Sequence, residues 1–137
     1  MNPNSELKRK LILGTVQLGL DYGVNNLSGK PSESEADSIL DLAYRSGVFS
    51  LDTAQAYGVS QKVIGNFLTH SPGKKFRIFT KFKSDGMSLS EQLEKTLSEL
   101  AVPEVYGYSF HRFEDVQNSA IIRELENLKT KQKIKKV

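Results

Sequence analysis

Leu51-Asp52-Thr53-Ala54-Gln55-Ala56-Tyr57-Gly58 is the stretch that decides the fold, because an apolar strand pattern ends here and titratable side chains follow. Two shorter junctions of the same kind come later, Phe79-Thr80-Lys81 and Phe110-His111. The carboxyl ends of parallel strands meet at one edge of a sheet. The sequence therefore predicts that titratable side chains from three strands gather at one edge.

Strand and helix patterns alternate on both sides of these junctions. Ser32 and Glu35 have the spacing of a capping box, in which each side chain bonds the main-chain N–H of the other residue. Four β/α pairs joined by short loops predict parallel strands with right-handed crossovers, an α/β fold. Strands are expected at 11–13, 48–51, 76–80 and 105–110, and helices at 32–46, 60–68, 88–100 and 119–131.

Two parallel architectures compete, an open doubly wound sheet and a (β/α)₈ barrel. An open sheet that binds a dinucleotide carries G-x-G-x-x-G after its first strand, and Gly14-Thr15-Val16-Gln17-Leu18-Gly19 has the wrong spacing. A barrel places its chemistry at the carboxyl ends of several strands, where the titratable residues lie here. Because a barrel takes ~250 residues and the chain has 137, we expect the first four units of a TIM (β/α)₈ barrel, a half barrel.

Composition excludes several classes of protein. The chain has no cysteine, so it has neither disulfides nor thiolate metal sites, which fits a reducing cytoplasm. It has no apolar run near 18 residues and no secretory signal pattern, so no membrane contact is expected. Two histidines and scattered acidic residues show no metal-ligand spacing, and His70 has the context of a solvated loop residue.

The net charge of +3 arises from one end of the chain. The last eleven residues hold five of the 19 basic residues and no acidic one. This run follows an expected helix, and lysine is favoured near a helix carboxyl end by the helix dipole. We therefore interpret it as a solvated helix end, and not as a nucleic-acid surface, which would interleave basic and aromatic residues.

Asp52, Tyr57, Lys81 and His111 form a proton-transfer constellation. Each alone has an ordinary interpretation, as a turn aspartate, a half-buried tyrosine, a solvated lysine and a rim histidine. A nearby ammonium stabilises a phenolate, so Lys81, held by Asp52, would make Tyr57 a general acid for a carbonyl oxygen. His111 would orient that carbonyl through a hydrogen bond. No side chain supplies hydride, which requires a nicotinamide.

These segments resemble the aldo-keto reductase family. The resemblance rests on residues 51–60 together with the Ile64-Gly65 pair that follows them. It also rests on Thr80-Lys81, on His111 and on Gly14-Thr15 at the end of the first strand. It implies an NADPH-dependent oxidoreductase that reduces an aldehyde or ketone in the cytoplasm. It further implies catalytic roles for Asp52, Tyr57, Lys81 and His111, and cofactor contacts from Gly14, Thr15 and Asp52.

The chain departs from the family pattern at a few positions. Gln61 stands where members usually carry Glu, and we expect it to cap a helix. Tyr106 stands where many members have an acidic residue. The segments Val16-Gln17-Leu18-Gly19 and Tyr22-Gly23-Val24-Asn25-Asn26 look like a bacterial branch found with surface-polysaccharide genes, which points to a sugar-like carbonyl substrate.

The family fold is a full barrel whose NADPH site draws mainly on the later strands. By this resemblance, residues 1–137 are the N-terminal half of one aldo-keto reductase domain, truncated before strand five, with most of the cofactor site beyond Val137. A half barrel leaves strand edges that invite pairing with another chain. We favour a fragment of a longer chain over a homodimer that completes a barrel, or a non-catalytic remnant.

Three functions stay open at this point. The first is a carbonyl reductase, or its tetrad-bearing half, that acts on a small-molecule carbonyl compound. The second is a binding or assembly module without chemistry, which pairs through its strand edges. The third is another barrel enzyme in which Lys81 forms a Schiff base.

Overall fold

A computed structural model describes residues 10–137 of the chain. Its strands and helices alternate, as the sequence predicts. In chain order the elements are β1 (Leu13–Gly14), α2 (Val16–Gly19), α3 (Glu33–Arg45), β2 (Ser50–Asp52), α4 (Ser60–His70), β3 (Arg77–Phe82), α5 (Leu89–Leu100), β4 (Val105–Phe110), the 3₁₀ helix η1 (Phe113–Gln117), α6 (Ser119–Thr130) and β5 (Ile134–Lys136).

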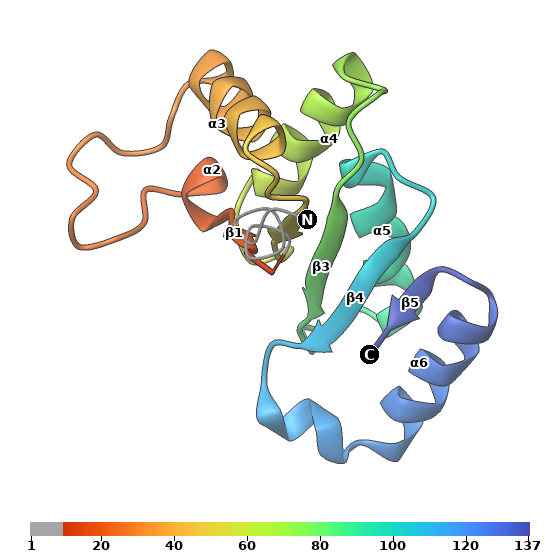
Figure 1. The fold of residues 1–137 in the computed structure, drawn as a ribbon. Coiled ribbons are helices and arrows are strands. Elements are labelled where there is room, and N and C mark those ends of the chain that lie inside the picture. Colours follow the sequence, from red (N-terminus) through yellow and green to blue (C-terminus); the bar gives the residue numbers. More distant parts are fainter. Residues whose placement is uncertain (1–9) are drawn as a thin grey trace.

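The strands of the described region form one sheet in the order β1-β2-β3-β4-β5, and every neighbouring pair is parallel. Figure 1 shows this progression from β1 in red to β5 in blue, with helices between successive strands. This arrangement confirms the predicted α/β fold built from parallel β/α units. It also brings the carboxyl ends of the strands to a common edge, as a parallel sheet requires.

The last strand is the main difference from the expected element count. Ile134 pairs with Val105 in β4, so four strands was one too few for the described residues. The lysines near this end do not all belong to a helix end, because α6 stops at Thr130 and two of them lie in β5. Two of these five lysines are also paired, Lys133 with Glu94 and Lys135 with Glu104. The sequence at 133–137 looks like the run into a fifth strand, but a three-residue strand with a single buried apolar residue has too little periodicity to fix its bounds or its pairing.

Two capping boxes start helices of this fold. Ser32 accepts a hydrogen bond from the main chain of Glu35, whose carboxylate accepts bonds from Ser32 in return, as the spacing predicted. Ser88 and Glu91 make the same exchange at the start of α5. Hydrogen bonds from the Ser32 hydroxyl and main chain lower the pKa of Glu35, and bonds from the Ser88 main chain and hydroxyl lower that of Glu91.

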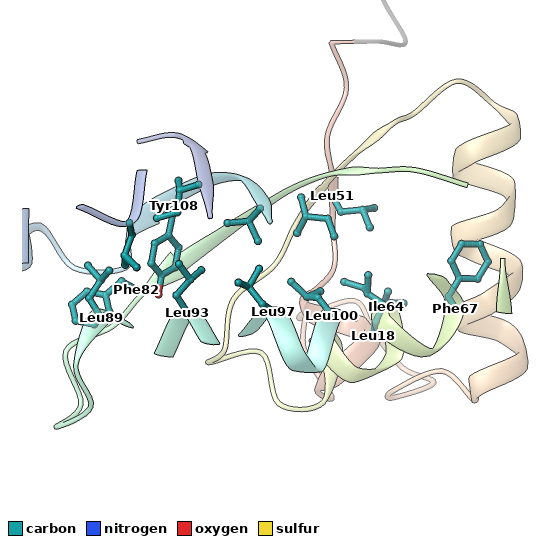
Figure 2. Packing of buried hydrophobic residues seen from close by; sticks show 14 of the residues in the cluster. Leu18, Leu51, Ile64, Phe67, Phe82, Leu89, Leu93, Leu97, Leu100 and Tyr108 are labelled. Atoms are coloured by element: carbon teal, nitrogen blue, oxygen red, sulfur yellow. The ribbon is translucent and has the colours of Figure 1, made fainter. Parts of the chain in front are cut away.

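The core lies between the sheet and the helices. The leucine stripe of α5 is buried throughout, from Leu89 to Leu100, and each such side chain contributes about 1.5–3 kcal/mol relative to an exposed one. Figure 2 shows Tyr108 of β4 packed among these leucines, close to Leu89 and Leu93. The Tyr108 hydroxyl is buried without a hydrogen-bond partner among the described residues, and burial raises the pKa of Tyr108.

Two short helical segments, α2 and η1, were not expected from the sequence. Both follow directly after strands and are too short to show a 3.6-residue period. His70, expected in a loop, is the exposed last residue of α4, and its ring lies 2.9 Å from the Asn66 carbonyl oxygen. None of the helices in residues 10–137 combines the length and apolar character needed to cross a bilayer.

Candidate active site

An ion pair joins the ends of two neighbouring strands. Asp52 is the last residue of β2, and Lys81 lies near the end of β3. Lys81 Nζ lies 2.7 Å from each carboxylate oxygen of Asp52 and 3.4 Å from the Thr53 carbonyl oxygen. The Lys81 and Asp52 side chains keep 21% and 36% of their surface exposed, so water screens the pair only in part.

Tyr57 completes this cluster from the turn after β2. Lys81 Nζ lies 3.3 Å from the Tyr57 hydroxyl and 5.1 Å from the centre of its ring. The ammonium therefore contacts both a carboxylate and a phenol. The structure brings together Asp52, Tyr57 and Lys81, three of the four residues that the sequence singled out.

His111 reaches the same region from β4. Its main-chain N–H donates to the Phe82 carbonyl oxygen over 2.7 Å, which holds His111 beside the end of β3. Its exposed side chain lines a hollow of about 340 Å³ together with Tyr57. The remaining lining residues are Val16, Leu20, Tyr22 and Ala56. His111 thus shares a hollow with Tyr57, and among the described residues no hydrogen bond links its imidazole to the other three.

A family model for the aldo/keto reductase family matches residues 10–137. The chain belongs to this family. Two similar solved structures are provisionally assigned aldo-keto reductases of Pseudomonas aeruginosa. PA4992 is 29% identical with a TM-score of 0.75 and is matched over 90% of this chain and 52% of its own. The second is 27% identical with a TM-score of 0.72, over 90% of this chain and 51% of its own.

This chain therefore spans about half the length of those two structures. Its sheet corresponds to half of an aldo-keto reductase barrel, which confirms the predicted half barrel. A search of curated proteins found no match. Members of the family are oxidoreductases that generally use NAD(P)H on small carbonyl compounds.

Three buried hydroxyl side chains lie next to the main chain of Asp52. Thr15, Thr53 and Ser60 are fully buried. The Thr15 hydroxyl donates to the Asp52 carbonyl oxygen, and Ser60 Oγ lies 2.9 Å from Thr15 Oγ1 and 3.3 Å from Thr53 Oγ1. Ser60 Oγ also lies 2.9 Å from the Thr15 carbonyl oxygen, so its single proton is shared between two oxygens of Thr15, while the Thr15 hydroxyl donates to Asp52. The sequence analysis missed this network, although all its members lie in or beside the family segments.

Close backbone packing fixes the turn that carries Tyr57. A Cβ on Gly19 of α2 would collide with the Tyr57 carbonyl oxygen. Gly58 has a φ of +57°, and a Cβ there would lie 2.5 Å from the Gly19 carbonyl oxygen. Only glycines allow the two backbones to lie this close, and so α2 determines where Tyr57 lies.

The expected cofactor residues differ in accessibility. Thr15 is fully buried, and both its hydroxyl and its N–H donate to the Asp52 carbonyl oxygen. Its side chain is therefore occupied in the protein interior. Gly14 is exposed at the end of β1, and a Cβ there would meet no atom within 4 Å. The open space at Gly14 and the partly exposed carboxylate of Asp52 leave room for a flat ring, such as that of a nicotinamide, at the carboxyl ends of β1 and β2.

The prediction that Gln61 caps a helix is wrong. The residue before α4 is Val59, and it makes no side-chain cap. Gln61 is only 1% exposed, and its amide nitrogen donates to the Thr80 hydroxyl over 3.0 Å. Its amide oxygen lies 3.4 Å from the Thr96 hydroxyl. Gln61 faces the layer between α4, β3 and α5, where a buried amide needs such partners.

The part of the chain that the structure describes holds no group of three or more histidine, aspartate or glutamate side chains placed to bind a metal ion. The cluster around Lys81 instead combines a carboxylate, an ammonium and a phenol. This combination suits transfer of a proton to a neutral acceptor in the hollow.

Proposed function

We propose that this chain carries the catalytic half of an NADPH-dependent aldo-keto reductase that reduces an aldehyde or ketone. The observation that supports it most is the contact of one ammonium with two partners. Lys81 donates to both carboxylate oxygens of Asp52 and lies 3.3 Å from the Tyr57 hydroxyl. This engagement suits a fixed positive charge better than the free amine that a Schiff base would require.

In the proposed reaction, Tyr57 gives its hydroxyl proton to the carbonyl oxygen of the substrate as the carbonyl carbon receives hydride. Lys81 stabilises the phenolate that Tyr57 becomes, and Asp52 holds Lys81 in place. His111, on the wall of the same hollow, donates a hydrogen bond to the carbonyl oxygen. Water then returns a proton to Tyr57, and the product is an alcohol.

NADPH, when bound, supplies the hydride. Among the described residues, Gly14 and Asp52 would hold its nicotinamide end, since Gly14 leaves open space and Asp52 is partly exposed. Thr15 would support this end from within the protein, because it is fully buried and both its hydroxyl and its N–H bond the Asp52 carbonyl oxygen. The absence of cysteine supports action in the reducing cytoplasm.

The test is Tyr57→Phe in a complete barrel that contains this half, assayed as aldehyde-dependent loss of NADPH absorbance. Phenylalanine keeps the ring beside Lys81 and removes only the hydroxyl group that would donate the proton, so turnover should fall about 10²- to 10⁴-fold. Tyr44→Phe is the matched control, because the Tyr44 ring packs edge-on against Phe49 and Phe76, away from the hollow. Undiminished turnover in Tyr57→Phe would reject the proton-donor role.

A second candidate is an assembly module that pairs through its sheet edges. The open order of the sheet, with β1 and β5 at its edges, favours it. However, β5 carries exposed Lys135 and Lys136, and charged edge strands resist pairing. Sedimentation together with NADPH fluorescence separates the two functions, because a dimer without a nucleotide signal would support assembly.

A further inference from the structure

Tyr22 and Tyr57 both line the hollow of about 340 Å³. We propose that Tyr22 determines substrate specificity by receiving the flat face of an uncharged ring on the carbonyl substrate. This inference rests on the proposed function, since it assigns the substrate class of the same site.

Two side-chain amides converge on one carbonyl group. The Tyr22 carbonyl oxygen accepts hydrogen bonds from Gln17 Nε2 over 2.9 Å and from Asn26 Nδ2 over 3.1 Å. The Asn26 amide also donates to the Gly29 carbonyl oxygen over 3.0 Å. Figure 1 shows this segment as the loop that projects between α2 and α3. Although the loop is long, the hydrogen bonds from Gln17 before Tyr22 and from Asn26 after it hold the main chain in place at Tyr22.

Other contacts of the loop serve the same conformation. The Asp21 carboxylate accepts the Lys30 main-chain N–H over 2.6 Å, which closes the base of the loop. Gly23 has a φ of +109°, and a Cβ there would lie 2.9 Å from Gln17 Nε2. Glycine at this position therefore gives Gln17 its access to Tyr22. Ordering these residues costs conformational entropy, yet the Tyr22 residue stays 57% exposed.

Tyr22 differs from Val24 and Leu27, the other exposed apolar residues of this loop, because only Tyr22 lines the hollow. An amphipathic ring in that position can contact a ligand. The volume of the hollow lies in the range of small-molecule sites. Its wall holds three aliphatic side chains, two phenols and one imidazole, with no carboxylate, ammonium or guanidinium group. Behind Tyr57, the charge of Lys81 is already paired with Asp52.

These properties define the ligand. A charged substituent would lose hydration in the hollow without gaining a counter-charge, whereas a ring can lay its C–H or π face on Tyr22. An aromatic ring and a sugar ring share this chemistry, so the experiment includes both. A ring stacked on tyrosine is worth enough that its loss should weaken binding roughly two- to tenfold.

The absence of tryptophan from the chain provides a direct assay. Tyr22→Trp places a single indole in the hollow, and its fluorescence reports binding without any hydride transfer. Benzaldehyde and gluconolactone supply an aromatic and a sugar ring, 4-carboxybenzaldehyde adds a charge, and hexanal lacks a ring. We expect a saturable signal with one or both neutral rings, and at least tenfold weaker responses to 4-carboxybenzaldehyde and hexanal.

Phe113→Trp is the control reporter, because Phe113 is 75% exposed and does not line the hollow. It should show only a linear, collisional response. The same signal from both reporters, no saturation in Tyr22→Trp, or equal binding of the charged probe would overturn the proposal.

A second measurement uses the natural tyrosine. The affinity for benzaldehyde, measured from the broadening of its NMR lines, should fall roughly two- to tenfold in Tyr22→Ala and in Asn26→Ala. It should be unchanged in Asn25→Ala, whose exposed side chain makes no hydrogen bond in the described structure. In turnover assays of a complete barrel that contains this half, KM for benzaldehyde should rise in Tyr22→Ala while kcat stays constant. Binding of the ring without any turnover would refute the proposed reductase activity but not the role of Tyr22. Turnover with an unchanged KM in Tyr22→Ala would refute the role of Tyr22 but not the reductase activity.

Discussion

Asp52→Asn tests the ion pair that the proposed mechanism depends on, and it needs no turnover. Asparagine keeps the shape of the side chain but removes the charge that Lys81 contacts twice. Exposed ion pairs contribute about 0.2–1 kcal/mol, and breaking a buried pair costs about 3–5 kcal/mol. With 21% and 36% of its side-chain surfaces exposed, this pair lies between the two limits. We therefore expect Asp52→Asn to lower the free energy of unfolding by about 1–3 kcal/mol.

The assay is urea denaturation of a double-mutant cycle made of Asp52→Asn, Lys81→Met and both together. The cycle should give a coupling energy of about 1–2 kcal/mol that decreases as salt is added. Glu94→Gln is the control, because Glu94 and Lys133 are 62% and 38% exposed and 3.7 Å apart. It should change stability by less than about 0.5 kcal/mol. A coupling energy near zero for Asp52 and Lys81 would refute the geometry on which the proposed proton transfer rests.

Further predictions concern the core and the helix starts. Tyr108→Phe removes a buried hydroxyl that has no partner among the described residues, so its unfolding free energy should be unchanged or about 1 kcal/mol higher. Ser60→Ala interrupts the buried hydroxyl network and should cost about 1–3 kcal/mol in the same urea assay. The folded-state pKa values of Glu35 and Glu91 are lowered, so their stabilisation is complete above the unfolded value of 4.5 and is lost as pH falls through the folded pKa. Glu91→Gln keeps a capping box and should flatten the loss of thermal stability in this acid range.

The order of the elements was predictable because most of them carry a strong local signal. β4 has the predicted bounds, Val105–Phe110, since aromatic and β-branched residues fill it and Pro103 precedes it. The Ser32 capping box was also predictable, because it depends on two residues at a fixed spacing. For β5 only a run toward a strand at 133–137 could be recognised, and α2 could not be predicted, because three or four residues show no period and their formation depends on neighbours distant in the chain.

The candidate site also contains residues that could be predicted from the sequence and residues that could not. Asp52, Tyr57 and Lys81 could be selected because each follows a strand pattern and parallel strands align their ends. Gln61 could not be understood from its position after a helix start, since its partners Thr80 and Thr96 lie on other elements. A buried amide is explained only by the groups that meet it in three dimensions.

Tyr57 is the residue at which two environments of this protein meet. On one side its hydroxyl contacts Lys81, which Asp52 holds. On the other side it lines the hollow that contains Tyr22 but no charged side chain. Because residues that share no partner contribute independently, charge changes at Asp52 should alter proton transfer while changes at Tyr22 alter substrate selection. The combined variant Asp52→Asn with Tyr22→Ala should therefore show additive effects on the free energy of activation, and strong coupling between them would contradict this separation.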